Sequence, residues 1–162
     1  MSIYKNLVGY GPRAERGEKY YSISIFGYTW YIEKGDMLDE EHYREGNYFL
    51  NEEEAMTRAF VESLSRKLNQ FADYCAQSAP LIKDDDSNET IHKWYYVIYD
   101  TKEMIFRPTF TWSHMRNWET SYFAKEEDCI RAIKEIVEPM NDDFAKARCE
   151  MLARKAEQNK NK

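Results

Sequence analysis

A nine-residue stretch that returns seventy-four positions later constrains the fold of this chain more than any other feature. Residues 47–55 read NYFLNEEEA, and residues 121–129 read SYFAKEEDC. In both copies two aromatic residues precede an acidic triplet, and apolar residues at helical spacing follow at once. The repetition predicts a chain organised as two copies of one small unit.

The acidic triplet of the first copy has the chemistry of a helix start. Asn51 is a good N-cap, and Glu54 follows three residues later, as in a capping box. The acids also complement the positive end of a helix dipole. Apolar residues keep helical spacing from Ala55 to Cys75. We therefore predict a long helix from about Glu52 to about Ala76.

Alternating side chains ahead of the first copy predict strands. Apolar and polar residues alternate over residues 21–25, which is the period of a sheet with one covered face. Gly27 interrupts the pattern and residues 28–32 resume it, so either a tight hairpin or one long bulged strand is expected. Residues 33–46 lose the periodicity and fill with acids, which is typical of a solvated loop.

A second pair of strands is predicted ahead of the second copy. Tyr21 corresponds to Tyr95 at the same offset, so the match reaches back into the strand. Residues 94–99 and 104–107 have strand composition and are joined by a polar turn.

Two prolines in the second copy are expected to interrupt its elements. Pro108 should end the return strand, so that residues 109–112 form another edge strand. Pro139 should stop or kink the helix that follows the second acidic triplet.

Together these elements predict an α+β fold of two pseudo-repeated β-β-α units, with an antiparallel sheet packed against two long helices. The expected parts are an N-terminal arm at 1–19, a first unit at 20–82, a polar linker at 83–92, and a second unit with a C-terminal helix at 93–158. A single hairpin with one helix rarely stands alone, so the units should combine into one compact domain.

Composition favours a soluble cytoplasmic protein and argues against generic nucleic-acid binding. The formal net charge is −6 and the pI is near 5.2, whereas nucleic-acid binding needs a basic face. The three cysteines form no C-x-x-C pair, which favours a reducing compartment. No apolar run approaches the roughly 20 residues of a membrane span, and the first residues lack a signal-peptide core.

The sequence shows no constellation typical of catalysis, a cofactor or a metal. His42, His92 and His114 lie in separate segments without a cysteine or histidine at ligand spacing. Cys75 and Cys129 follow apolar helical spacing, and neither stands in a glycine-rich turn beside a histidine. We therefore expect no catalytic residue, no cofactor, no bound metal and no enzymatic activity.

One candidate binding feature is the acidic segment 33–54, which holds nine acids against two bases. Such a segment can present a negative surface to a basic partner, as a nucleic-acid mimic does; the alternative is a solvated loop that runs into a helix start. The candidate partner-binding residues are Asp36, Asp39, Glu40, Glu41 and Glu45.

The other candidate is the loop between two tryptophans. Its candidate residues are Trp112, His114, Arg116 and Trp118. Aromatic rings interleaved with a cation can stack on bases or anchor a protein interface. The alternative is that they cap the end of the sheet.

The first copy also carries a resemblance. Residues 46–55, GNYFLNEEEA, resemble the G-N-x-F-x-T-x-E-E-A unit of small proteins from bacteriophages and mobile elements of Firmicutes. Asn51 replaces the usual Thr, and the second copy lacks the Gly-Asn pair and has Cys129 for Ala. The resemblance covers roughly half of the chain. It implies a structural module without catalytic residues, and by its context a small phage accessory protein that acts on host machinery.

These observations support one leading hypothesis and one alternative. The leading hypothesis is a non-enzymatic accessory protein in the host cytoplasm that binds a host protein or ribonucleoprotein complex, as an anti-CRISPR inhibitor of bacterial defence does. The alternative is a nucleic-acid-binding module that uses residues 112–118. No membrane partner is expected. An apolar face after Pro139 serves either a homodimer or packing on the chain's own sheet.

Overall fold

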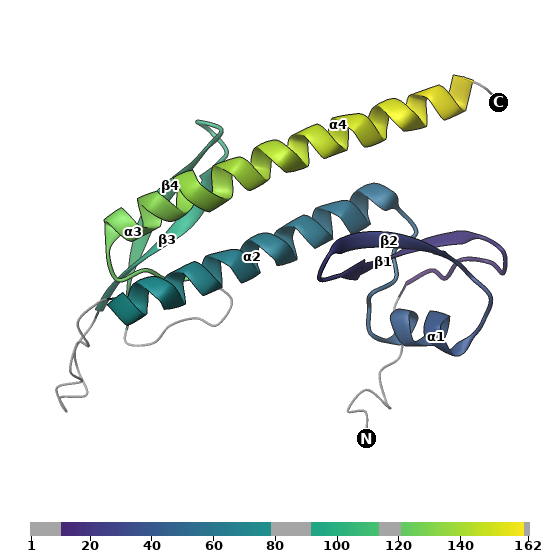
Figure 1. Ribbon diagram of the computed structural model, residues 1–162, viewed down its shortest axis with the longest axis horizontal. Helices are drawn as coiled ribbons and strands as arrows, with labels where there is room; N and C mark the ends of the chain where they lie inside the picture. Colours follow the sequence, from purple (N-terminus) through teal and green to yellow (C-terminus); the bar gives the residue numbers. More distant parts are fainter. Residues whose placement is uncertain (1–10, 79–91, 114–120, 161–162) are drawn as a thin grey trace. The chain divides into compact units, whose positions relative to one another are not determined.

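The computed structural model describes residues 11–78, 92–113 and 121–160, and it divides the chain into two compact units, Met1–Ser63 and Leu64–Lys162. Each unit contains one two-stranded antiparallel sheet, so the fold is α+β (Figure 1). The elements are β1 Lys19–Ser24, β2 Gly27–Ile32, α1 Met37–Arg44, α2 Glu52–Ser78, β3 His92–Asp100, β4 Ile105–Ser113, α3 Glu126–Ala132, the π-helical turn η1 Ile133–Val137, and α4 Glu138–Lys160.

The first sheet is a tight hairpin, which decides between the two expected arrangements around Gly27. Ser24 pairs with Gly27, so the connection is only Ile25 and Phe26. Gly27 has a φ of +117°, which a glycine adopts without strain, and it lets two non-glycine residues form the apex.

The second edge of β1 is covered by the segment that carries the repeated stretch. Tyr21 and Phe49 exchange backbone hydrogen bonds of 2.8 and 2.9 Å. The Asn47 side chain continues this pairing, because its amide accepts from the Ile23 N–H at 2.7 Å and donates to the Ile23 carbonyl at 2.9 Å. β2 is therefore the outer strand of the first sheet.

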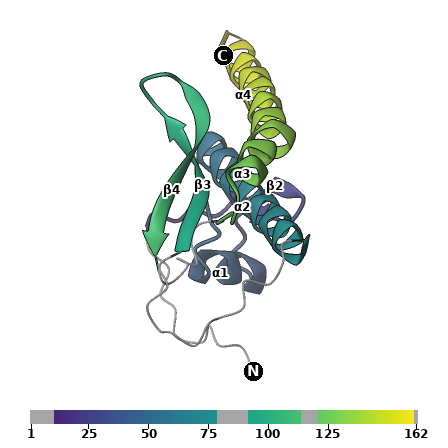
Figure 2. The same cartoon turned by 90° about the vertical axis from the view of Figure 1, so that its left-hand side faces the viewer.

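The second sheet is a twisted hairpin in which β4 runs unbroken through Pro108 (Figure 2). The predicted break was wrong for a geometric reason. Tyr95 turns its N–H and carbonyl away from β4 to pair with Phe123, and Val97, two residues on, is oriented alike. Val97 faces Pro108, so the proline nitrogen points outward and no ladder bond is lost.

Helical structure also continues past Pro139. α3, η1 and α4 follow one another without a gap, and the Glu138 N–H donates to the Ile133 carbonyl, five residues back. In a regular α-helix the Pro139 ring would collide with the Glu135 carbonyl. The wider π turn before the proline accommodates the ring, so the predicted stop does not occur.

Helix α1 lies where a loop was expected over residues 33–46. Asp36 caps its N-terminus, and Asp36 and Asp39 form a capping box. Gly46, at a φ of +70°, ends the helix. The Gly46 N–H donates to the Tyr43 carbonyl and the Asn47 N–H donates to the His42 carbonyl, which is the pattern of a Schellman motif.

The boundary between the units lies inside α2 and not in the linker at 83–92. Residues 79–91 lie outside the described residues. The first part of α2 starts at the Asn51 cap, which accepts from the Glu53 N–H at 2.9 Å, and it buries Ala55. Its later part supplies Ala72 to the core of the second unit. The other members of that core are Phe123, Cys129 and Ala132, with Leu68, Phe71, Tyr95 and Val97 packed against them.

α2 itself agrees with the helix predicted from the acidic triplet, and it runs two residues further than expected. In the ranges that the structure describes, no helix is both long and apolar enough to cross a membrane.

Candidate functional site

The centre of the first unit is a stack of tyrosine rings. Tyr20 is fully buried, and its ring lies 4.0 Å from the Tyr48 ring and 5.5 Å from the Tyr31 ring, centroid to centroid. Tyr20 comes from β1, Tyr31 from β2, and Tyr48 from the repeated stretch. The alternation of β1 directs Tyr20 and Ser22 to this covered face.

Asp39 of α1 joins this stack through the Tyr20 hydroxyl. Tyr20 donates to Asp39 Oδ1 at 2.8 Å, and the same hydroxyl lies 3.0 Å from His42 Nδ1. A carboxylate only accepts hydrogen bonds, so the hydroxyl proton is directed to Asp39. His42 must then carry a proton on Nδ1 and donate it to the tyrosine oxygen.

Asp39 stays ionised although its side chain is buried. Burial opposes the charged form, but the N–H groups of Lys34 and Asp36 and the Tyr20 hydroxyl all donate to the carboxylate. These bonds lower the pKa of Asp39 to about 2. Burial and the bond to Asp39 also raise the pKa of Tyr20 far above its ordinary value.

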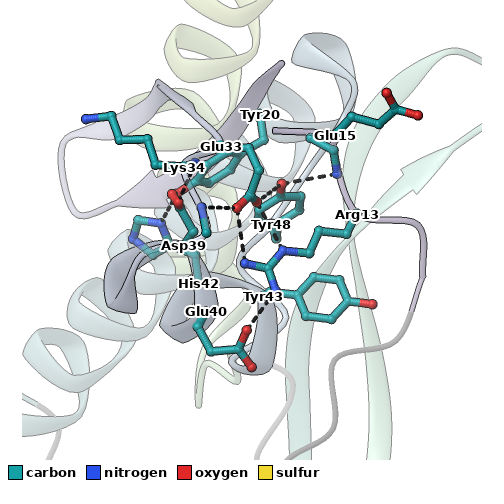
Figure 3. A network of polar contacts seen from close by, with 12 residues as sticks. Arg13, Glu15, Tyr20, Glu33, Lys34, Asp39, Glu40, His42, Tyr43 and Tyr48 are labelled. Carbon is teal, nitrogen blue, oxygen red and sulfur yellow. Dashed lines mark hydrogen bonds and ion pairs between the residues drawn. The ribbon is translucent and has the colours of Figure 1, made fainter. Parts of the chain in front are cut away.

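Arg13 closes the other side of the network (Figure 3). Its guanidinium binds both oxygens of Glu33 at 3.1 Å and Glu40 at 2.7 Å. Glu33 also accepts from the Tyr48 hydroxyl at 2.6 Å, and that hydroxyl accepts from the Ala14 N–H at 3.2 Å. A bidentate guanidinium–carboxylate pair holds its partners in one fixed geometry.

The charges at this end of the network stabilise one another. Burial disfavours the ionised form of Glu33, but the bonds from Arg13, Tyr48 and the Gly35 N–H outweigh it and hold the pKa of Glu33 below its usual value. Burial and the bond to Glu33 raise the pKa of Tyr48. The hydrogen bonds to Glu33 and Glu40 raise the pKa of Arg13.

This network acts as an internal clamp. It joins the loop before β1, both strands, α1 and the repeated stretch, and its carboxylates are occupied by donors of the protein itself. No group of three or more His, Cys, Asp or Glu side chains in the described ranges is arranged to hold a metal ion. The arrangement positions the hairpin and leaves little capacity for binding an external ion.

The structure places the candidate residues of the acidic segment in different settings. Asp36 caps α1, and Asp39 is only 2% exposed. Glu40 is bound by Arg13 and by Arg44 at 2.6 Å. Glu41 and Glu45 are exposed. Asp39 thus serves the interior and presents no charge to a partner. The distant donors, Tyr20 to Asp39 and Arg13 to Glu40, carried no local signal in the sequence.

Near Glu45 the first unit has an open hollow of about 310 Å³. Its lining includes Asn47, Phe49 and the ion pair between Arg58 and Glu62, whose atoms lie 3.0 Å apart. Glu45 also lines this hollow, so its lining carries two carboxylates and one guanidinium. It holds no set of converging acid and base groups of the kind that catalysis needs.

The tryptophan-loop candidates are described only in part. Trp112, near the end of β4, is 61% exposed, and its ring lies edge-on to Phe110 at 6.5 Å. His114, Arg116 and Trp118 lie outside the described residues. Lys93 places its Nζ 4.1 Å from the Phe110 ring centre, within reach of a cation–π interaction.

An equivalent lysine–aromatic contact occurs in the first unit. Lys19 Nζ lies 4.7 Å from the Trp30 ring centre. Lys19 corresponds to Lys93 at the offset of the repeat, and Trp30 faces Tyr21 as Phe110 faces Tyr95.

The hairpin of the first unit also presents exposed apolar side chains, which were not among the candidates predicted from the sequence. At its apex Ile25 and Phe26 are 70% and 93% exposed, and Trp30 on β2 is 56% exposed. The sequence did contain a signal for this apolar surface, since residues 20–32 contain no charged side chain. Turn positions ordinarily carry polar residues or glycine, so an apolar apex is an interaction candidate.

Comparison with known proteins adds no assignment, because no protein-family model matches the chain and neither a curated protein nor a solved structure is found to be similar to it.

Proposed function

We propose that this protein is a non-enzymatic binding protein that holds a host macromolecule, and that it inhibits a bacterial defence complex of the CRISPR type. The single observation that carries the binding role is the uncharged hairpin of residues 20–32 with its exposed apolar apex. The resemblance of residues 46–55 to a module of phage and mobile-element proteins supports the choice of a host target.

The apex has the properties of an interface anchor. Phe26 offers a nearly complete ring to solvent, and large aromatic residues contribute most to binding when they enter a partner's pocket. The Ser24 hydroxyl accepts from the Phe26 N–H at 3.2 Å, which holds the turn in place. The clamp below the sheet further restricts the hairpin, so little ordering cost remains to be met on binding.

We also propose that the chain is a tandem of one β-β-α module, with each hairpin followed by a long helical segment. Four pairs of positions at the offset of seventy-four support this. Tyr21 with Phe49 and Tyr95 with Phe123 form the same backbone bridge. Ala55 and Cys129 are both fully buried. Lys19 and Lys93 both lie over an aromatic ring.

An affinity-capture experiment tests the binding role. Host lysates with and without an expressed RNA-guided defence complex are passed over the immobilised wild-type protein, a Phe26→Asp variant and a Val61→Asp control. Val61 is an exposed apolar residue of the same unit on α2, so the control makes the same chemical change away from the apex. Wild type and control should retain the complex, and Phe26→Asp should lose it.

A plasmid-interference assay then tests the inhibitory role. Cells that carry the defence complex should accept a targeted plasmid when wild type or Val61→Asp is expressed, and should reject it with Phe26→Asp. If the wild-type protein is recovered alone from both lysates and leaves interference intact, the proposal fails.

One observation favours a nucleic-acid-binding module as the second candidate. Lys93, Phe110 and exposed Trp112 form a cationic and aromatic cluster on the second hairpin, suited to base stacking beside a phosphate. Fluorescence anisotropy with a single-stranded oligonucleotide over a salt series tests it. Binding should fall steeply with salt and be weakened by Lys93→Gln but not by the exposed Lys102→Gln. No binding at low salt would end this alternative.

A further inference from the structure

The outer edge of β2 is an open strand edge. Tyr21 directs its N–H and carbonyl to Phe49, so the backbone groups of the facing Trp30 point away from β1. Ile32, two residues on, has the same orientation. In the part of the chain that the structure describes, neither Trp30 nor Ile32 has a hydrogen-bond partner on this outer edge.

The corresponding edge of the second hairpin is protected. β4 is the outer strand there, and Pro108 places a nitrogen without a proton on that edge. Arg107 adds a charge. Proline and charge are the usual means by which proteins prevent edge-to-edge pairing. β2 reads GYTWYI, with neither a proline nor a charge, so only one of two equivalent edges is left open.

The open edge is complementary to itself. When two copies of β2 run antiparallel with Tyr31 at the twofold axis, Trp30 of one copy faces Ile32 of the other. The outward N–H and carbonyl groups of each residue then bond across the axis. On the same face the pair brings an aromatic ring against a β-branched side chain, a favourable cross-strand combination.

We propose that this edge binds a second copy of the chain, giving a dimer with one continuous antiparallel sheet of four hairpin strands. Charge argues for a second copy. The protein carries a formal charge of −6, but residues 20–32 carry none, so two copies meet along this edge without facing like charges. A two-stranded sheet is marginal by itself, and two added strands satisfy its outer backbone groups.

The dimer does not depend on the proposed function, since it uses the side of β2 and not the Phe26 apex. Sedimentation equilibrium over roughly 1 to 500 µM protein measures it, a range suited to a small edge interface. Ile32→Lys is compared with Trp112→Lys. Ile32 faces Lys19 in the first hairpin, and Trp112 faces Lys93 in the second. Each variant therefore replaces an apolar residue by lysine at the equivalent position of its hairpin.

The wild-type protein should dimerise within this range. Ile32→Lys should raise the dissociation constant at least tenfold, while Trp112→Lys should change it less than twofold. In wild type, amide exchange at Trp30 and Ile32 should slow as concentration rises, which locates the interface even if the Ile32→Lys variant folds poorly.

Three results would overturn the proposal: a monomer at the highest concentration, equal effects of the two lysine variants, or exchange at Trp30 and Ile32 that does not depend on concentration. Protection of these two amides only after addition of host protein to a monomeric chain would also overturn it, and would assign the edge to a foreign strand.

Discussion

Replacing Asp39 by Asn tests the internal clamp most directly. The carboxylate accepts three hydrogen bonds, from the Tyr20 hydroxyl on one oxygen and from the N–H groups of Lys34 and Asp36 on the other. Asn keeps one accepting oxygen and places an NH₂ group where the other stood. At pH 7 we expect the free energy of unfolding to fall by about 2–3 kcal/mol, because a buried charge-assisted bond is lost and a donor then faces a donor.

The pH dependence of this loss follows from the pKa of Asp39. It is about 2 in the fold against 3.8 for a free aspartate side chain. Such a difference corresponds to about 2 kcal/mol of stability. Because the folded pKa is the lower one, this stability is fully present above about pH 4 and is lost as the pH falls through 2. Asp39→Asn should remove this contribution, so the gap between wild type and variant should narrow from pH 5 to pH 2.5.

Urea denaturation at pH 7, 5, 3.5 and 2.5 measures the effect. The indole NMR signal of Trp30 reports on the first unit, since Trp30 is the one tryptophan in residues 1–63. Glu41→Gln is the matched control, because it removes one negative charge from the exposed side of the same helix. A constant gap between wild type and Asp39→Asn across this pH range, or an equal loss in Glu41→Gln, would refute the role assigned to Asp39.

Three further predictions concern local features. Asn47→Ala removes both bonds to Ile23 and should cost about 1–2 kcal/mol, seen as faster amide exchange at Ile23; unchanged exchange would contradict the pairing. Gly46→Ala should lower the free energy of unfolding by about 1 kcal/mol, seen as a lower urea midpoint, because the φ of Gly46 is +70°. An unchanged midpoint would count against that backbone conformation. Cys149 should react with a thiol reagent in the folded protein, whereas Cys129, whose pKa burial raises to about 12, should react only after unfolding; simultaneous reaction would show that Cys129 is accessible.

The clamp also bears on how the hairpin would bind. A binding surface loses less entropy when its backbone is already fixed. Weakening the clamp through Asp39 should therefore lower affinity for any partner of the apex while leaving Phe26 in place. A variant that loses stability but keeps full affinity would separate the clamp from binding.

The features that the sequence predicted well depend on interactions between near neighbours. Asn51 and the acids after it mark the start of α2, because a cap and a helix dipole act within one turn. The period of two in residues 21–25 predicted a strand for the same reason, although it left open whether Gly27 marks a hairpin or a bulge. The capping box formed by Asp36 and Asp39 also depends on near neighbours, so recognising it in the sequence would have predicted α1.

Tertiary structure alone decided the roles of the acidic residues and the prolines. Asp39 and Glu33 are structural because Tyr20 and Arg13, nineteen and twenty residues away, donate to them, and no periodicity encodes such pairing. Pro108 fits within β4 because β3 pairs with Phe123 on its other side, so that Val97 offers no hydrogen bond to Pro108 and the proline nitrogen lies on the outer edge of β4. The sequence by itself determined the second hairpin and the helix start at the first copy of the repeated stretch, since those depend on local hydrogen bonds and periodicity. The choice between a hairpin and one bulged strand at Gly27 was made by the fold. The clamp and the one open edge required long-range contacts, which only the folded chain brings together.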